Sequence, residues 1–198
     1  MGRPAKHTTD DFVDAAVALF ARSGVRAVTL GAVADALGAA NGSVYHRFAD
    51  RPSLLAAVWL RTSRRFAGAY RVRLGDPTVE SVIATAVWVV EWCRENLAEA
   101  QVLLAGMRAF GPDEWPAEAR AAATTDEQIG RELRASVRRL AAQTAASPEE
   151  IVFAMAELPI AVVRRPLQAG QAPGPREADL VRRLAARILT TPAEPSAG

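Results

Sequence analysis

The sequence has few of the residues that most often carry enzyme chemistry. Its 198 residues include one cysteine, Cys93, and two histidines, His7 and His46. A single cysteine excludes an internal disulfide and indicates a reducing compartment. The sequence also has no metal-spaced ligand cluster, no glycine-rich phosphate loop and no nucleophile motif. We therefore expect no catalytic residues, no metal and no cofactor, and an enzyme is disfavoured.

Long apolar runs are absent as well. The longest lies within residues 82–93, where Glu91 interrupts it, whereas a membrane span needs about 20 apolar residues. Residues 1–11 are polar and lack the apolar centre of a signal peptide. The sequence thus predicts a soluble, cytoplasmic protein with no membrane partner.

Strand-forming isoleucine, tyrosine, phenylalanine and threonine are sparse, while alanine, arginine, leucine and valine dominate. This bias predicts an all-α fold. Charge is uneven, because residues 1–75 hold 11 Lys/Arg and 5 Asp/Glu, whereas residues 76–198 hold 13 and 17. A basic front end on a mildly acidic body suits a nucleic-acid contact at one end, although ordinary surface charge gives the same pattern.

Apolar periodicity and capping residues predict about nine helices. Thr8 with Asp11 and Ser147 with Glu150 have the spacing of capping boxes, and Pro159 and Pro166 are expected to kink or divide the eighth helix. The fifth helix is apolar nearly all round, so we expect it to be central and buried. The expected segments are about 9–23, 30–38, 41–48, 51–73, 78–96, 97–110, 115–145, 148–168 and 176–189.

Residues 12–55 contain three short helices followed by a longer one, with a tight turn at residues 38–40 between the second and third. This order predicts a helix-turn-helix on an N-terminal support helix. Six apolar residues are expected to form the small core that fixes the angle between the second and third helices: Leu19, Phe20, Val33, Leu37, Val44 and Phe48.

The same stretch resembles the TetR family over about fifty contiguous residues. The matching residues are Ala15-Ala16, Leu19-Phe20, Gly24, Thr29, Val33-Ala34, Leu37-Gly38, Gly42, Val44-Tyr45, Phe48 and Leu54-Leu55. The rest of the chain resembles the family only in helix count and length. There are departures: Ala40 stands where the family usually has a capping serine, so Asn41 is expected to take the cap, and Leu30-Gly31 follows the Thr29 cap where relatives often carry a polar residue.

The resemblance implies binding to double-stranded DNA through the third helix. We expect Asn41, Ser43 and His46 to read bases, with Leu30, Gly31 and Gly42 close to the bases or backbone. Thr29, Tyr45, Arg47 and Arg51 are expected to contact or face the DNA backbone. Arg3 and Lys6 lie in an N-terminal arm that either reaches DNA or remains a solvated tail.

The resemblance also implies a small-molecule pocket among the fourth to eighth helices. Large apolar side chains are expected to line it, and they suit an apolar or aromatic effector. The alternative is that they simply form the core. The candidate residues are Phe66, Tyr70, Trp88, Trp92, Leu103, Met107, Phe110 and Trp115. Glu91 and Glu157 lie inside apolar runs and are expected to need partners.

The last two helices are expected to pair with those of a second copy, as the resemblance implies. They carry more apolar surface than two terminal helices need. The residues expected at this homodimer interface are Val152, Met155, Ile160, Val163, Leu180, Leu184 and Ile188, with Phe153 in the same apolar excess.

These expectations describe a ligand-responsive DNA-binding regulator with no enzyme activity. It would bind a palindromic operator as a homodimer and act as a repressor that a small apolar or aromatic molecule releases from the operator. An activator is the other possibility. The competing class is a helical small-molecule-binding or scaffold protein without specific DNA binding. The expected parts are a DNA-binding domain at 1–51, a ligand-binding and dimerisation domain at 52–191 and a disordered tail at 192–198.

Overall fold

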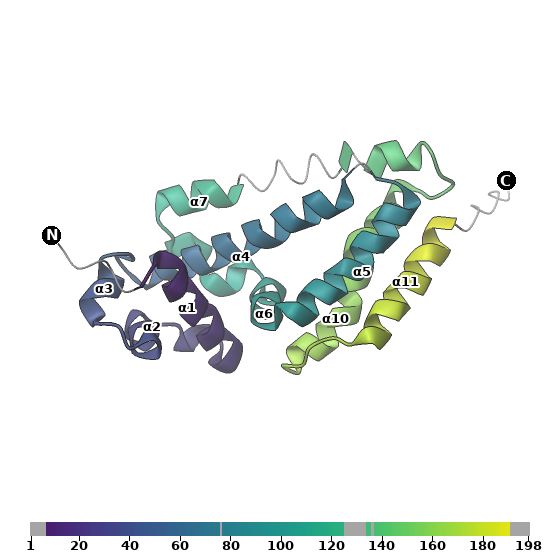
Figure 1. Cartoon of the computed structure of the whole chain (residues 1–198). Helices are drawn as coiled ribbons and strands as arrows, with labels where there is room; N and C mark the ends of the chain where they lie inside the picture. Colours follow the sequence, from purple (N-terminus) through teal and green to yellow (C-terminus); the bar gives the residue numbers. More distant parts are fainter. Residues whose placement is uncertain (1–6, 76, 125–133, 136, 191–198) are drawn as a thin grey trace. The chain divides into compact units, whose positions relative to one another are not determined.

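The computed structural model describes residues 7–75, 77–124, 134–135 and 137–190. These residues form helices and turns, with no strand among them, which confirms the all-α prediction (Figure 1). The chain divides into two compact units. Unit 1 comprises Met1–Arg65 and Ala98–Thr125, and unit 2 comprises Phe66–Leu97 and Asp126–Gly198. The predicted tail and the arm residues Arg3 and Lys6 lie outside the described residues.

Unit 1 is built from short helices around one core. Its elements are α1 (Thr9–Ser23), the 3₁₀ turn η1 (Val25–Ala27), α2 (Leu30–Leu37), α3 (Asn41–Tyr45), the first part of α4 (Arg51–Leu74), α6 (Leu97–Ala105), the 3₁₀ turns η2 (Met107–Phe110) and η3 (Pro112–Glu114), and α7 (Ala117–Thr124). The capping box predicted at Thr8 is present, because its hydroxyl accepts from the Asp11 amide and the Asp11 carboxylate accepts from the Thr8 amide.

The core of unit 1 joins its two sequence segments. Phe12, Val33 and Val44 are fully buried, and Phe110 and Trp115 from the later segment are buried in the same cluster. The Phe110 carbonyl also accepts a hydrogen bond of 2.8 Å from the Trp115 indole. The helix-turn-helix therefore shares its hydrophobic core with residues that follow it by more than fifty positions.

Unit 2 is organised around α5 (Val79–Glu95). It also contains the end of α4, α9 (Pro148–Val152), the π-helical segment η4 (Phe153–Glu157), α10 (Leu158–Gln168) and α11 (Pro175–Thr190). Helix α5 packs against α10, α11 and η4, and the three α-helices lie side by side (Figure 1). Eight of its 17 residues are buried, including Val82, Val90 and Trp92, which agrees with the prediction of a central fifth helix.

The predicted eighth helix is divided by a π-helical turn just before Pro159. Because proline has no N–H, Pro159 cannot donate to the Met155 carbonyl four residues earlier. The Tyr70 hydroxyl donates to that carbonyl instead, at 3.1 Å. Pro166 does not divide the helix, since α10 continues through it to Gln168.

Other boundaries differ from the predictions. The third helix ends at Tyr45 rather than Phe48. The sixth ends at Ala105, where Gly106 introduces the 3₁₀ turn η2. The seventh segment is α7 and a separate helical stretch at residues 134–135 and 137–141, and residues 125–133 between them lie outside the described part. Within the described ranges, no helix has the length and apolar character needed to cross a bilayer.

Candidate nucleic-acid interface

The turn between α2 and α3 depends on one glycine. Gly38 has φ 59° and ψ 33°, in the left-handed region that glycine adopts without a steric penalty. Its amide donates to the Asp35 carbonyl, and the Ala39 amide donates to the Ala34 carbonyl at 2.9 Å. These bonds end α2 and allow α3 to begin three residues later.

The angle between α2 and α3 is held by buried side chains. Val33, Val44 and Phe48 are buried in the core of unit 1, and Leu37 packs against them. Leu19 and Phe20 on α1 also pack against this cluster. The six residues predicted to form this core therefore do so, and α3 is fixed on the inside while its opposite face remains exposed.

The exposed face carries several of the predicted DNA contacts. Tyr45 is 57 % exposed, and His46 and Gly42 are also exposed. Thr29 is exposed and uses its hydroxyl to accept from the Ala32 amide at 3.1 Å, which caps α2 as predicted. Gly31 and Ser43 are half-buried, and the Ser43 hydroxyl donates to the Ala40 carbonyl. This face presents polar groups on a short, supported helix.

Two predicted positions need revision. Leu30 is buried in the core, so only its backbone is free to approach a ligand. The N-cap of α3 is Ala40, which offers no side-chain hydrogen bond, and Asn41 is the first helical residue. The expectation that Asn41 takes the cap was wrong, because the backbone turns into the helix one residue earlier.

Arg47 holds the parts of unit 1 together. Its guanidinium donates to the Ser43 carbonyl at 2.9 Å and to the His7 carbonyl. The same group lies 5.1 Å from the centre of the Phe12 ring, within the range of a cation–π contact. Arg47 thus links the end of α3 to the residues that precede α1.

Arg51 holds the segment between α1 and α2. Its Nε donates to the Val28 carbonyl at 2.8 Å, and its Nη2 donates to the Val25 carbonyl at 2.7 Å. No sequence pattern indicated these acceptors, because they are backbone carbonyls more than twenty positions away. A direct phosphate contact by Arg47 or Arg51 stays a prediction, while their positioning contacts are part of the fold.

Comparison with known proteins identifies this part of the chain. Residues 12–58 match the sequence pattern of the family described as "Bacterial regulatory proteins, tetR family". These residues cover the support helix, the helix-turn-helix and the start of α4.

This match places the N-terminal segment in the TetR family.

A curated relative is the "HTH-type transcriptional regulator AcrR" of Shigella flexneri, which is 34 % identical over 55 residues. The match covers 28 % of this chain and only 26 % of that relative's length. Solved structures show the same fold over nearly the whole chain. The TetR-family regulator PfmR from Thermus thermophilus has a TM-score of 0.70 at 19 % identity and covers 97 % of this chain and 100 % of its own. A TetR family transcription regulator from Marinobacter aquaeolei has a TM-score of 0.68 at 19 % identity. The match covers 91 % of this chain and 94 % of that one.

The predicted effector residues are divided between the two units. In unit 2, Phe66 contacts both Trp88 and Trp92, with ring centroids 5.7 and 4.9 Å apart, and also the ring of Tyr70. The other four, Leu103, Met107, Phe110 and Trp115, belong to unit 1, where Phe110 and Trp115 are buried in its core and Met107 is exposed. Burial raises the pKa of the Tyr70 hydroxyl well above its usual range.

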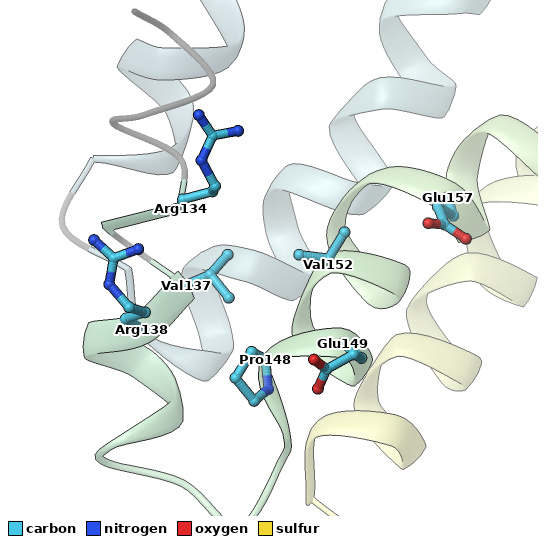
Figure 2. A pocket seen from close by; sticks show the side chains of 7 residues that line it. All are labelled: Arg134, Val137, Arg138, Pro148, Glu149, Val152 and Glu157. Atoms are coloured by element: carbon cyan, nitrogen blue, oxygen red, sulfur yellow. The ribbon is translucent and has the colours of Figure 1, made fainter. Parts of the chain in front are cut away.

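Unit 2 contains a cavity of about 520 Å³ that the sequence did not indicate. Arg134 and Arg138 lie on one side, on the helical stretch near residue 137, and Glu149 and Glu157 lie on the other, on α9 and η4 (Figure 2). Val137, Pro148 and Val152 lie between the two sides. Glu157 is exposed here, so it does not need the buried partner that was expected. The sequence pattern missed this site because its residues come from two segments whose contact only the fold creates.

The residues predicted at a dimer interface fall into two groups. Ile160 and Leu180 are exposed, and Val152, Leu184 and Ile188 are half-buried. Met155 and Val163 are buried in the chain's own core, because the π-helical turn and α10 direct them toward α5. An apolar outer face therefore remains, to which exposed Phe153 also contributes.

Proposed function

We propose that this TetR-family chain is a transcription regulator that binds a palindromic operator in double-stranded DNA as a homodimer. The observation that carries the proposal is the outward face of α3, where Tyr45 and His46 are exposed above a buried core. Such a supported helix fits a major groove about 12 Å wide. Base reading is assigned to Ser43, His46 and Asn41, and backbone contact to Thr29, Tyr45, Gly31 and Gly42.

Selection of bound sequences from random DNA with the purified chain tests this proposal. A palindromic consensus with half-sites about one helical turn apart, near 34 Å, is expected. Recovery of no enriched sequence would contradict it. A repressor lowers transcription from a promoter overlapping that consensus in a purified system, whereas an activator raises it.

A helical small-molecule-binding protein without specific DNA binding is the second candidate. It is favoured by the internal contacts of Arg47 and Arg51, which leave fewer cations on the α3 face. Salt dependence separates the two candidates, because neutralised phosphates release counterions and affinity then falls steeply between about 50 and 200 mM salt. A shallow dependence with no sequence preference supports the second candidate.

We further propose that the 520 Å³ cavity of unit 2 is the effector site. Its volume lies within the roughly 300–1,000 Å³ range of small-molecule pockets. Within the described residues, none of its four charged side chains forms an ion pair with another protein group. The lining of the cavity fits an effector with an apolar body and two charged ends. The cationic end would face the glutamates and the anionic end the arginines.

The charge pattern can be tested with 8-aminooctanoate, octanoate and octylammonium as probes. The zwitterion is expected to raise the thermal midpoint more than either singly charged probe, and Arg138→Gln or Glu149→Gln should remove that advantage. Equal shifts of the thermal midpoint with all three probes would contradict the proposal that the arginines and the glutamates both contact the effector. A change in operator affinity on adding the zwitterion would connect the cavity to DNA release.

A further inference from the structure

Arg61 on α4 lies between carboxylates of two other helices of unit 1. Its Nη2 is 2.6 Å from the Asp14 carboxylate on α1 and 3.8 Å from the Glu99 carboxylate on α6. Its Nη1 also donates to the Asp10 carbonyl at 3.2 Å. Arg65, one turn further along α4, donates to Glu99 at 2.9 Å. One guanidinium thus has a potential partner on α1 and another on α6.

The two carboxylates differ sharply in exposure. The Asp14 side chain is 66 % exposed, whereas the Glu99 side chain is 9 % exposed. Because the Asp14 carboxylate is largely exposed, water can hydrogen-bond to it and competes with its ion pair to Arg61. Glu99 is shielded from water, so an additional donor has a larger effect on it.

Hydrogen bonding around Arg61 is incomplete. Glu99 Oε2 is buried without a hydrogen-bond partner, and so are Nε and Nη2 of Arg61. The close Nη2–Asp14 contact is therefore an ion pair without hydrogen-bond alignment. A buried unsatisfied donor and a buried unsatisfied acceptor each have a free-energy cost, which favours their meeting. The 3.8 Å separation joins Arg61 Nη2 to Glu99 Oε1, which already accepts from Arg65, so a side-chain movement of about 1 Å would bring the Arg61 guanidinium within hydrogen-bond length of this carboxylate.

We propose that Arg61 is a two-position positioning residue, which binds either Asp14 on α1 or Glu99 on α6, and that its choice sets the placement of the helix-turn-helix. Helix α1 packs on α2 and η1, and Arg47 ties the residue before its cap to the end of α3. A change in how α1 is held therefore reaches α3 through direct contacts. The proposal rests on the proposed DNA binding and adds a mechanism for its regulation.

Opposite effects of two similar substitutions test the proposal. Asp14→Asn weakens the partner on α1, so Arg61 moves toward Glu99, and Glu99→Gln has the reverse effect. Both changes remove one negative charge, which by itself strengthens DNA binding. Asp10→Asn is the matched control, because it removes a charge one turn from Asp14. The Asp10 carboxylate lies 3.8 Å from Arg61 Nη1 but is 78 % exposed, so water screens that ion pair, and the Asp10 carbonyl that binds Arg61 remains.

Affinity is measured on the operator consensus found by selection. Relative to Asp10→Asn, the Asp14→Asn and Glu99→Gln variants are expected to change operator affinity in opposite directions, each by about fivefold or more. In an Arg61→Gln background both differences should disappear. Changes in the same direction, or opposite changes that persist without Arg61, overturn the proposal. If Glu99→Gln does not fold, Asp14→Asn alone tests the proposal. Its effect on operator affinity relative to Asp10→Asn should disappear in the Arg61→Gln background, and an effect that persists there overturns the proposal.

A readout without DNA separates this proposal from the proposed function. If the wild-type chain enriches no DNA sequence, DNA binding fails, and the two-position residue is then judged from stability alone. In double-mutant cycles by urea unfolding, Glu99→Gln should strengthen the coupling between Arg61 and Asp14. An unchanged coupling shows that Arg61 does not choose between the two carboxylates and overturns the proposal.

Discussion

Several arginine side chains of unit 1 make hydrogen bonds and ion pairs within the unit. Arg47 and Arg51 donate to backbone carbonyls, and Arg61 contacts carboxylates on two helices. Counting charges along residues 1–75 therefore overstates the positive charge that is free to meet a phosphate. Side-chain direction cannot be obtained from a charge count, because long side chains reach acceptors far away in sequence.

Tyr45 provides the clearest single-residue prediction for DNA binding. Its side chain is largely exposed, so Tyr45→Phe should leave the thermal midpoint unchanged. Loss of a hydroxyl that donates to a charged phosphate should weaken operator binding about tenfold. Fluorescence anisotropy with labelled operator measures the affinity. Reduced stability with unchanged affinity would assign Tyr45 to packing instead.

Cys93 predicts a pH dependence of stability. Burial raises the pKa of its thiol from 9.0 to about 12. Between these values the unfolded chain loses the thiol proton and the native chain keeps it, so stability is full below pH 9 and falls as the pH rises toward 12.

Urea unfolding at pH 8 and pH 10.5 measures this fall, and Cys93→Ala is the control. The wild-type chain should lose more stability than the variant over this interval. Equal losses would show that the thiol ionises equally easily in both states.

At the scale of the helix, the sequence predicted what depends on near neighbours. Thr8, Thr29 and Ser147 all cap the helices expected of them, because a capping bond joins residues three apart. The core beneath α3 was predictable for the same reason, since periodic apolar positions have one inner face. The internal acceptors of Arg51 and the walls of the cavity were not, because they depend on contacts between distant segments.

The π-helical turn at residues 153–157 illustrates that limit. Proline at 159 indicated a disturbance, but nothing local identified Tyr70 as the group that would bind the released carbonyl. The fold creates that pairing by bringing the end of α4 and η4 together in unit 2.

Tyr70→Phe tests the contribution of this bond to stability. Removing the hydroxyl leaves the Met155 carbonyl without its donor, so unfolding should require about 1–2 kcal/mol less free energy. In a Pro159→Ala background the new backbone N–H can replace the hydroxyl, and the cost of Tyr70→Phe should become smaller. Urea unfolding of the four chains in this cycle measures both effects. An equal cost in both backgrounds would contradict the proposed link to Pro159.

At the scale of the whole molecule, the apolar face of α10 and α11 predicts self-association. Ile160 is 44 % exposed and Phe153 is 42 % exposed, and burying such side chains against a second copy is favourable. Ile160→Asp should therefore shift the chain toward monomer in sedimentation velocity. Val72→Asp is the matched control, because Val72 is 85 % exposed on α4 and should leave association unchanged. A wild-type monomer, or equal effects of both substitutions, would contradict the dimer.

Unit 1 is built from two separate stretches of the chain, which limits how its DNA-binding segment can be exchanged with that of another protein. Residues 98–125 supply Val102, Phe110 and Trp115 to the cluster that also contains Phe12 and Val44. A chimera that exchanges only the first fifty or sixty residues with another regulator would bring a foreign recognition helix onto ill-matched supporting side chains. Transfer of operator preference requires both segments, so the two stretches should evolve under joint constraint even though more than thirty positions separate them.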